Sequence, residues 1–275
     1  MTQTDKVILV TGAGGGLGGA MAEALAGAGH TVAAVDVSGE RLDALCARAK
    51  NLPGRIAPFT ADLADRAVCE GLPAQVIERC GDLFMVVNNA GVGMQVVDPD
   101  YSKNPRPFWE TSIEGWETVM NINARAPLIL SKAAVTHFMS KGRGRIVNVT
   151  TSFDTMISPR TWAYGQSKAA LEAMTASLAS TLQSTPVRMN ILVPGGPANT
   201  GLLPANTDLP REKIIQPPVM GPPIVWLASD EAADFNNRRM VARLWDASIP
   251  GPEAAAKASA PAAWPGFGVQ AAQPA

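Results

Sequence analysis

The sequence predicts an α/β fold, in which helices cover both faces of a parallel β-sheet. Short apolar runs typical of buried strands alternate with longer helical runs along most of the 275 residues. Consecutive strands that are separated by helices run parallel, because each helix carries the chain back across the sheet. A glycine-rich segment also joins the first strand to the first helix. The chain is long enough for one large domain with a sizeable core.

The composition excludes several classes of protein. The formal net charge is −1, so there is no electrostatic reason to expect binding to nucleic acid or to an anionic membrane. No apolar run reaches roughly 18 residues and the segment 1–6 is polar, so we expect no membrane span and no signal sequence, and infer a cytoplasmic location. The three cysteines lack CxxC spacing, which predicts neither a disulfide framework nor a metal site.

The first strand is predicted over 6–10, where four apolar residues follow one another. The segment 11–19 (TGAGGGLGG) forms the glycine-rich loop, and an alanine-rich helix follows over 20–28. This is the order that a dinucleotide site requires, because glycines let the backbone approach a pyrophosphate. The free N–H groups at the N-terminus of the helix favour the phosphates. We therefore expect the phosphates of a dinucleotide at this loop.

The second strand is predicted over 31–37 and carries Asp36 near its end. A carboxylate at this place can accept hydrogen bonds from both ribose hydroxyls of NAD, and it repels the 2′-phosphate of NADP. Gly15 offers no cation that would compensate such a phosphate. We therefore expect NAD as the preferred cofactor. The alternative is that Asp36 caps a helix or lies in an exposed loop.

The remaining elements continue the alternation of helices and strands. Helices are expected at 38–50, 74–80, 114–138 (interrupted at Pro127), 161–181 and 224–229, and strands at 56–60, 83–87, 144–152, 187–193 and 239–245. The turn at Asp62-Leu63 follows the third strand, where an adenine ring can lie. Asn88-Asn89-Ala90-Gly91 ends the fourth strand, at the edge of the sheet where ligands bind in open α/β folds.

Three segments do not fit this alternation. Residues 92–109 carry three prolines and no clear period, which is typical of a long surface loop or a lid. Residues 198–223 are rich in Pro, Asn and Gly, and we expect a mobile flap at the same end of the sheet. Residues 250–275 are rich in Ala and Pro and low in charge, so we expect a tail that is disordered or docks on a neighbouring subunit. The cofactor-binding domain is expected to span 1–249.

Tyr164 and Lys168 are the candidate catalytic pair. Their spacing of four residues puts both side chains on one face of the helix predicted over 161–181. A cation one turn away favours the phenolate, so the pKa of the tyrosine is expected to fall toward neutral pH. Such a tyrosine can exchange a proton with an alcohol oxygen. The chain has two tyrosines and two histidines, and neither histidine has an obvious partner, so few other residues are available for acid–base chemistry.

Taken together, these residues resemble the short-chain dehydrogenase/reductase family. The resemblance covers roughly residues 5–245. Six motifs in the family's order carry it: Thr11-Gly12-x-x-x-Gly16-x-Gly18, Asp62-Leu63, Asn88-Asn89-Ala90-Gly91, Asn123, Tyr164-x-x-x-Lys168 and Pro194-Gly195. The resemblance implies a single doubly wound Rossmann domain with a seven-stranded parallel sheet, and it implies a nicotinamide cofactor.

The resemblance also implies roles for individual residues. Tyr164 would be the general acid/base, Lys168 would lower its pKa and hold the nicotinamide ribose, and Asn123 would position a water in the proton relay. The implied cofactor-binding residues are Gly12, Gly16, Leu17 and Gly18 for the pyrophosphate, Asp36, Asp62 and Leu63 for the adenosine, Asn89, Ala90 and Gly91 along the cofactor, and Pro194, Gly195 and Thr200 at the nicotinamide end.

One position departs from the family's pattern. The substrate-orienting serine is expected thirteen residues before the tyrosine, and Thr151 stands there, with Ser152 next to it. A threonine hydroxyl can still donate a hydrogen bond to a carbonyl or alcohol oxygen. Its extra methyl group narrows the pocket and restricts χ1. We favour Thr151 for this role and keep Ser152 as the alternative.

The leading hypothesis is an NAD-dependent oxidoreductase that interconverts a secondary alcohol and a ketone, with a small, largely apolar substrate. The second hypothesis is a cofactor-binding regulator or scaffold of the same fold that has lost its activity, which Thr151 alone favours. The third is a reductase of 3-oxoacyl thioesters, which needs a basic landing surface that is not obvious in the loops. The resemblance suggests a homotetramer or homodimer built on the two long helices.

Overall fold

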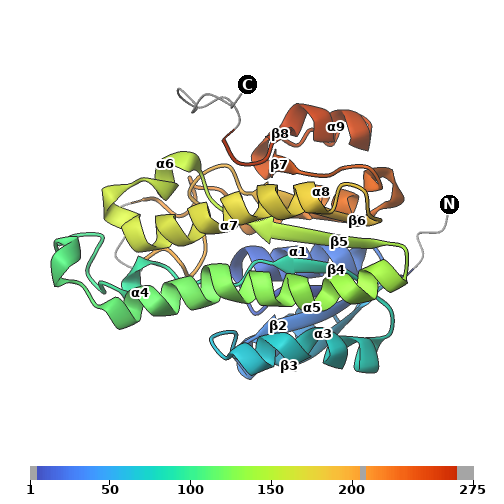
Figure 1. The fold of residues 1–275 in the computed structure, drawn as a ribbon, viewed down its shortest axis with the longest axis horizontal. Coiled ribbons are helices and arrows are strands. Elements are labelled where there is room, and N and C mark those ends of the chain that lie inside the picture. The colour runs from blue at the N-terminus through green and yellow to red at the C-terminus, as the bar shows by residue number, and fades with distance from the viewer. Residues whose placement is uncertain (1–4, 205–208, 265–275) are drawn as a thin grey trace, which may run out of the picture.

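The computed structural model describes residues 5–204 and 209–264. Within these ranges, eight strands form one sheet with the order β3-β2-β1-β4-β5-β6-β7-β8 (Figure 1). The first seven strands run parallel, and β8 pairs with β7 in the antiparallel direction. The prediction of a single doubly wound α/β domain is confirmed, and the sheet has one strand more than the seven expected.

The bounds of the elements are close to those predicted for the parallel part of the sheet. The strands are β1 (Val7–Thr11), β2 (Thr31–Asp36), β3 (Arg55–Thr60), β4 (Leu83–Asn88), β5 (Gly144–Val149), β6 (Val187–Val193), β7 (Arg238–Val241) and β8 (Ser259–Pro261). The α-helices are α1 (Gly16–Gly27), α2 (Gly39–Arg48), α3 (Arg66–Cys80), α4 (Ile113–Met120), α5 (Ala126–Ser140), α6 (Phe153–Met156), α7 (Trp162–Thr181), α8 (Gly221–Ala228) and α9 (Gly251–Ala258).

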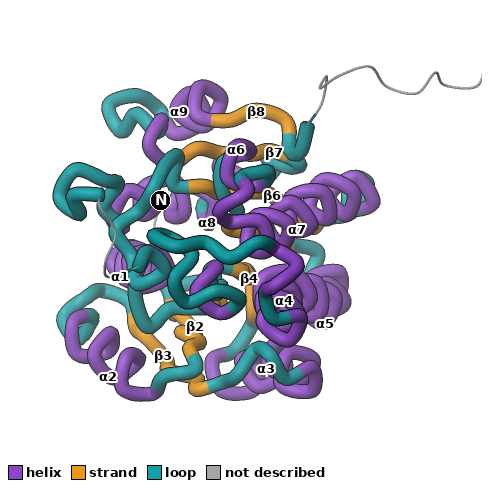
Figure 2. The backbone as a smooth tube through the Cα atoms, turned by 90° about the vertical axis from the view of Figure 1, so that its left-hand side faces the viewer, coloured by secondary structure: helices purple, strands orange, loops and turns teal. Residues whose placement is uncertain are grey.

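Helices lie on both faces of the sheet (Figure 2), and a hydrophobic core fills the space on each face. Helices α1, α2, α8 and α9 contribute to one core, and helices α3, α5 and α7 contribute to the other. Along β1, Ile8 and Val10 belong to the first core, whereas Val7 and Leu9 belong to the second. Because both faces are covered, the strands are apolar throughout instead of alternating with polar residues.

The strand order reverses direction at β1. The chain passes from β1 to β2 and β3 on one side, and then returns to place β4 on the other side of β1. Ligands of doubly wound sheets bind at the carboxyl ends of the strands beside such a reversal. The glycine-rich loop follows β1, and the Asn88-Asn89-Ala90-Gly91 segment ends β4, so both motifs meet at this point.

The helical region predicted at 114–138 is interrupted before Pro127, as expected. Helix α4 ends at Met120, a π-helical turn covers Asn121–Arg125, and α5 begins at Ala126. Pro127 lies in the first turn of α5, directly after the π-helical turn, and it has no N–H with which to continue the hydrogen-bond ladder of the preceding helix. A π-helical turn inserts extra backbone into a helix and often occurs at functional sites. Here it carries Asn123.

The expectation of disorder is wrong for residues 251–264, whereas docking of the tail on a neighbouring subunit stays a prediction. Residues Gly251–Ala258 form α9, and Ser259–Pro261 form β8 on the edge of the chain's own sheet. The alanines at 254, 255 and 258 are fully or almost fully buried, so small side chains form a helical contact face that the composition does not reveal. Residues 265–275 of the same tail lie outside the described residues.

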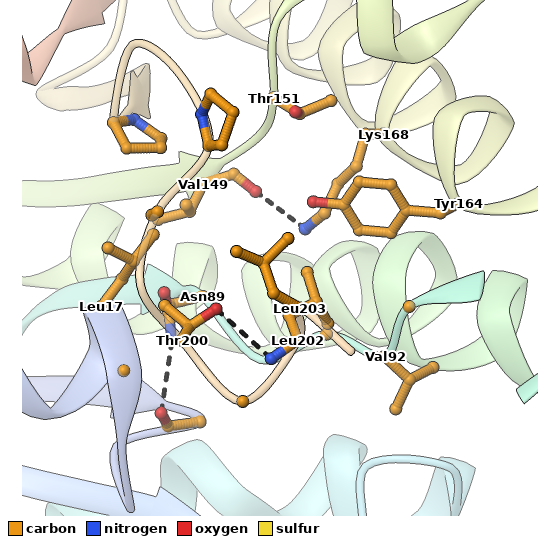
Figure 3. Close-up of a pocket in the computed structure, with 18 of the residues that line it drawn as sticks. Leu17, Asn89, Val92, Val149, Thr151, Tyr164, Lys168, Thr200, Leu202 and Leu203 are labelled. Atoms are coloured by element: carbon orange, nitrogen blue, oxygen red, sulfur yellow. Dashed lines mark hydrogen bonds between the residues drawn. The ribbon is translucent and has the colours of Figure 1, made fainter. Parts of the chain in front are cut away.

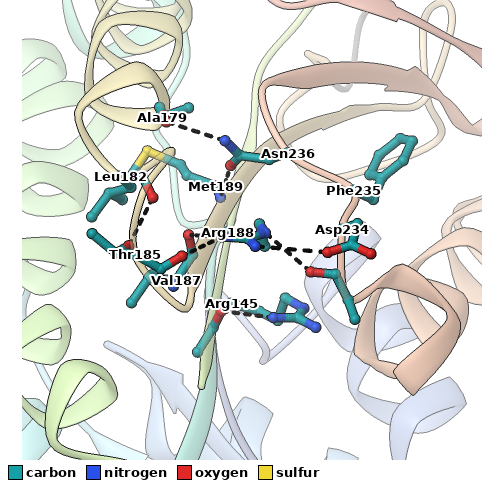
Figure 4. Close-up of polar contacts among 12 residues, drawn as sticks. Arg145, Ala179, Leu182, Thr185, Val187, Arg188, Met189, Asp234, Phe235 and Asn236 are labelled. Atoms are coloured by element: carbon teal, nitrogen blue, oxygen red, sulfur yellow. Dashed lines mark hydrogen bonds and ion pairs between the residues drawn. The ribbon is translucent and has the colours of Figure 1, made fainter. Parts of the chain in front are cut away.

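The segment that leads into β7 is fixed to β6 and to the end of α7 (Figure 4). The Asn236 side chain accepts a hydrogen bond from the Met189 N–H (2.9 Å) and donates one to the Ala179 carbonyl (3.1 Å). Arg188 on β6 donates to the Ala233 carbonyl (3.0 Å). These contacts set the place at which β7 enters the sheet.

Among the helices of the described ranges, none is long and apolar enough to cross a membrane.

Candidate active site

A cavity of about 860 Å³ lies at the carboxyl ends of the central strands (Figure 3). Its walls come from the loops after β1, β2, β4, β5 and β6 and from the first turns of α7. The predicted site residues that line it are Gly12, Gly16, Leu17, Asp36, Asn89, Ala90, Gly91, Thr151, Ser152, Tyr164, Lys168, Pro194, Gly195 and Thr200. The structure therefore brings most of the predicted residues to one place.

The glycine-rich loop forms one end of the cavity. Gly12 and Gly16 have φ angles of +64° and +55°, which L-residues with a side chain rarely adopt. Gly18 lies behind the cavity wall, where an added Cβ would be 2.2 Å from the Gly12 carbonyl oxygen. Its role is therefore to let α1 pack closely against the loop. In contrast, a Cβ at Gly15 would meet no atom within 4 Å.

The loop after β4 is clamped to β1 by Thr11. The Thr11 hydroxyl accepts hydrogen bonds from the N–H groups of Asn89 (2.9 Å) and Ala90 (3.0 Å), and it donates to the Val87 carbonyl. The Asn89 side chain donates in return to the Thr11 carbonyl (2.9 Å). These bonds hold the Asn89-Ala90-Gly91 wall of the cavity against the glycine-rich loop. The hydroxyl of Thr11 is a structural part of the site that its sequence position alone did not single out.

Asp36 lies at the end of the cavity beside the glycine-rich loop. Its carboxylate accepts hydrogen bonds from the N–H groups of Gly14 (3.0 Å) and Ser38 (3.0 Å). Arg41, which the sequence analysis did not select, lines the cavity beside it. A Cβ at Gly14 would lie 2.7 Å from the Arg41 Cβ and 2.8 Å from the Asp36 carboxylate, so the three residues are in close contact.

Tyr164 and Lys168 project from α7 into the opposite end of the cavity (Figure 3). The Lys168 ammonium donates to the Val149 carbonyl (2.9 Å) and lies 6.0 Å from the centre of the Tyr164 ring. Burial lowers the pKa of Lys168 to about 8 and raises the pKa of Tyr164 to about 12. The pKa of the tyrosine is therefore raised instead of lowered as expected, because loss of solvent outweighs the opposing effect of Thr151.

Thr151, rather than Ser152, faces Tyr164. The Thr151 side chain faces the Tyr164 hydroxyl and opposes the rise that burial causes in the tyrosine pKa. Ser152 caps the short helix α6, since its hydroxyl accepts from the Thr155 N–H and bonds the Thr155 hydroxyl at 2.8 Å. Both residues line the cavity, but Thr151, and not Ser152, affects the pKa of Tyr164.

Asn123 lies behind the cavity wall. Its amide accepts from the Val92 N–H (2.9 Å) and donates to the Val92 carbonyl (2.9 Å) and to the Ser167 hydroxyl (3.0 Å). The side chain is fully buried and does not line the cavity. Its amide therefore fixes the loop after Gly91 onto α7, and a role in holding a water stays a prediction.

Asp62 and Leu63 are not among the residues that line the cavity. The Asp62 carboxylate accepts from the Ala64 N–H (2.9 Å), and Leu63 is buried in the core beneath α3. Their contact with an adenine ring stays a prediction. At the other end, Thr200 closes over the glycine-rich loop, where a Cβ at Gly16 would be 3.1 Å from the Thr200 methyl group.

A family model described as short chain dehydrogenase matches residues 6–208. The chain belongs to the short-chain dehydrogenase family. Among its relatives is a 3-oxoacyl-[acyl-carrier-protein] reductase of Thermotoga maritima, which is 30% identical over 85% of this chain and 94% of that protein. A D-threitol dehydrogenase of Mycolicibacterium smegmatis is 29% identical over 86% of this chain and 90% of that protein.

Solved structures agree with this assignment. The crystal structure of a protein from Beutenbergia cavernae, described as an NAD(P) dependent gluconate 5-dehydrogenase with bound NADP, superposes with a TM-score of 0.73. It is 27% identical in sequence, and the match covers 86% of this chain and 94% of that protein. As a member of the short-chain dehydrogenase family, the chain is an oxidoreductase of the kind that acts on CH–OH groups.

A second cavity of about 560 Å³ adjoins the first in this dehydrogenase. The two cavities share Tyr101, Thr155, Thr161, Leu203 and Leu209. Lys103 from the 92–109 loop and Arg160 from the segment before α7 also line the second cavity, together with Asp154. The two cations are 57 residues apart in sequence, which is why the sequence analysis found no basic cluster in the loops.

The sequence analysis also missed partners of the histidines. His137 lies 2.8 Å from Asp82, which is 55 residues away in the chain, and does not line the main cavity. His30 accepts a hydrogen bond from the Lys6 N–H beneath the sheet, also away from the cavity. Neither histidine therefore competes with Tyr164 at the cavity, and the role of Tyr164 in acid–base chemistry stays a prediction.

Proposed function

We propose that this dehydrogenase interconverts a secondary alcohol and a ketone with NAD(H), and that Tyr164 is the general acid/base. One observation carries the proposal. Tyr164, Thr151 and Lys168 stand together on the wall of a cavity whose other end is the glycine-rich loop. A proton-transferring group and a dinucleotide cradle thus open into the same space.

The residues present fit a dinucleotide. The cavity extends from Asp36 past the glycine-rich loop to Tyr164, and Gly15 presents its backbone with no side chain in front of it. Gly12, Gly16 and Leu17 would surround the pyrophosphate at the start of α1, where the free N–H groups favour anions. The adenosine ribose would lie at Asp36, and the nicotinamide end would lie near Pro194, Gly195 and Thr200.

A bound nicotinamide supplies the hydride donor or acceptor for this chemistry. The Tyr164 hydroxyl can exchange a proton with the substrate oxygen, and the Thr151 hydroxyl, which faces it, can donate a hydrogen bond to the same oxygen. Lys168, anchored on the Val149 carbonyl, places a cation that stabilises the phenolate when the proton leaves. The contact between Thr151 and Tyr164 argues against an inactive scaffold, since Thr151 was the only residue that favoured one.

The preference for NAD rests on Asp36. Its carboxylate is held toward the glycine-rich loop by two backbone N–H groups, and a negative charge there repels a 2′-phosphate. Arg41 acts in the opposite sense, because a guanidinium beside this position can pair with a phosphate. We propose NAD because the Asp36 carboxylate directly contacts the loop that receives the cofactor.

A screen of secondary alcohols with NAD, and of ketones with NADH, tests the reaction. Replacement of Tyr164 by Phe should lower kcat by about 10²–10⁴-fold, since it removes the proton-transferring group. NADH binding should be retained, because the ring is kept. A Tyr164→Phe protein with wild-type turnover would rule out the proposed role of the tyrosine.

A second candidate reaction is the reduction of 3-oxoacyl thioesters. Lys103 and Arg160 at the second cavity supply the cationic surface that a phosphate-bearing thioester needs, and one relative is described as an acyl-carrier-protein reductase. Turnover of acetoacetyl-CoA should then fall in a Lys103→Glu/Arg160→Glu variant, whereas turnover of an uncharged ketone should not. If the double variant loses turnover of both substrates to the same extent, a small alcohol is favoured as the substrate over a 3-oxoacyl thioester.

We propose that the protein is cytoplasmic and forms a homodimer or homotetramer through α4, α5 and α7. Phe108, Trp109 and Ile113, beside the start of α4, are all more than 60% exposed. The Phe108 ring contacts Trp162 at the start of α7, so the apolar surface joins both helices. Sedimentation equilibrium measures the mass directly, and a monomer at micromolar concentration would contradict this proposal.

A further inference from the structure

Three successive residues at the exit of β5 are each held by a different charged side chain. Lys168 donates to the Val149 carbonyl (2.9 Å), as described above. The Thr150 hydroxyl donates to the carboxylate of Glu172 (2.6 Å). The Arg239 guanidinium donates to the Thr151 carbonyl. The loop that presents Thr151 to the cavity is therefore fixed at every residue.

Glu172 and Arg239 form a buried ion pair outside the cavity. The Arg239 Nε lies 3.2 Å from a Glu172 carboxylate oxygen. Glu172 is 0% exposed and Arg239 is 7% exposed. Neither residue lines the cavity. Two charges lose much of their hydration when they are buried, so such a pair is weak evidence for a contribution to stability. The hydrogen bonds that the pair makes to the β5 exit suggest another use.

The same pair is joined to the C-terminal arm, defined here as residues 259–264. The Ala263 N–H donates to the Glu172 carboxylate (3.2 Å). The Arg239 guanidinium stacks 4.4 Å from the centre of the Phe153 ring, and the Trp264 ring lies 5.9 Å from that ring. The arm, β7 and α7 thus meet at the outer side of the catalytic loop.

We propose that Glu172 and Arg239 are positioning residues, which hold the Thr151 carbonyl so that the Thr151 hydroxyl meets Tyr164. This inference rests on the proposed function, because it concerns the geometry of the same proton-transferring group. Glu172 orients Arg239 and holds Thr150, and Arg239 holds the Thr151 backbone.

Arg238 provides a matched comparison. It is the residue before Arg239 on β7, and its guanidinium donates to the hydroxyl and carbonyl of Ser259 on β8. It therefore secures the same C-terminal arm, and it has no contact with Thr151 among the hydrogen bonds of the described residues. A role in fold stability alone predicts similar consequences for the loss of either arginine. A positioning role predicts a catalytic defect for Arg239 alone.

The test compares Arg239→Met with Arg238→Met in the full chain. Arg239→Met should lower kcat by up to about 100-fold, since a displacement of about 1 Å can have that effect, while the KM for NADH stays within about twofold. Arg239→Lys, which keeps a cation beside Glu172, should recover part of the loss. Arg238→Met should keep wild-type kcat. If Arg239→Met alone does not fold, the double variant Arg239→Met/Glu172→Gln takes its place, because it leaves no unpaired buried charge. This double variant should show the kcat defect that is expected for Arg239→Met.

A double-mutant cycle separates positioning from a general structural effect. In a Thr151→Val background, the further change Arg239→Met should have little effect on kcat, because Arg239 acts through Thr151. If Arg239→Met lowers kcat by the same factor in the Thr151→Val background as in the wild type, the proposal is overturned. So would an Arg239→Met enzyme with wild-type kcat. If the wild type turns over none of the alcohols or ketones, the proposed function itself fails instead.

Hydrogen–deuterium exchange provides a readout that needs no substrate. In Arg239→Met, exchange should rise in the peptide that contains residues 149–156 and stay unchanged in the peptide that contains α1. In Arg238→Met, the rise should be confined to the peptide that contains β8. Unchanged exchange at 149–156 in Arg239→Met would show that the ion pair does not hold the loop.

Discussion

Lys168 and Tyr164 lie where burial opposes the charged form of each side chain. The pKa of the lysine falls to about 8 and that of the tyrosine rises to about 12. The site therefore holds the proton on Tyr164 until something else stabilises the phenolate. A cation at the nicotinamide end would do so, which fits a proton transfer that is coupled to the cofactor. The pKa of Tyr164 thus depends on the burial of its side chain more than on the spacing of four residues to Lys168.

The lowered pKa of Lys168 predicts a pH dependence of stability. The folded pKa of about 8 lies below the ordinary value of 10.5. Between these values the unfolded chain binds more protons, so the free energy of unfolding rises with pH; it is lowest below about pH 8. Compared with Lys168→Met, the wild type should gain up to about 3 kcal/mol of stability between pH 7 and pH 10.5.

Urea unfolding of both proteins at several pH values measures this difference. The comparison removes contributions from groups that titrate equally in the two proteins. A stability difference that does not change between pH 7 and pH 10 would show that Lys168 keeps an ordinary pKa in the folded protein.

At the scale of elements, the approach of α1 to the loop after β1 depends on Gly18. A Cβ there would lie 2.2 Å from the Gly12 carbonyl oxygen, so Gly18→Ala must push helix and loop apart. We expect Gly18→Ala to lower the free energy of unfolding by about 1–3 kcal/mol, as overpacking does, and to weaken NADH binding.

Gly15→Ala is the matched control for this prediction. Gly15 has an extended backbone (φ −175°), and its Cβ would meet no atom within 4 Å. The midpoint of thermal unfolding of Gly15→Ala should therefore stay close to that of the wild type. Equal destabilisation by the two alanines in thermal unfolding would contradict the packing that the structure shows at Gly18.

The loop over 98–106 is closed by one buried carboxylate. Asp98 is 1% exposed and accepts from the N–H groups of Asp100 (3.3 Å) and Arg106 (2.9 Å). Tyr101, at the centre of this loop, lines both cavities. Asp98→Ala leaves these N–H groups without their acceptor, which typically costs about 1–3 kcal/mol.

We expect Asp98→Ala to raise the KM for substrate and the rate of proteolysis within 98–106, with little change in NADH binding. Limited proteolysis followed by mass spectrometry locates the cut. A protease pattern identical to that of the wild type, with unchanged KM, would show that the carboxylate does not hold the loop.

At the scale of the whole molecule, the sequence predicts the parallel sheet because its strands are short apolar runs bounded by turn residues. The strand that it misses, β8, contains only Ser259, Ala260 and Pro261, which carry no apolar pattern. Its pairing with β7 depends on contacts that only the folded chain makes. The same limit applies to the pair Glu172 and Arg239, which are 67 residues apart. Local motifs reveal the cofactor loop and the Tyr164–Lys168 pair, but not what holds them.

The most direct test of the account is a titration of the protein with NADH and with NADPH, followed by fluorescence of the bound nicotinamide. NADH should bind more tightly, because the carboxylate of Asp36 lines the cavity beside the glycine-rich loop and would repel a 2′-phosphate. Asp36→Ala should narrow the difference by improving NADPH binding. Preference for NADPH in the wild type would show that Arg41 outweighs Asp36. Binding of neither nucleotide would contradict the proposed dehydrogenase function.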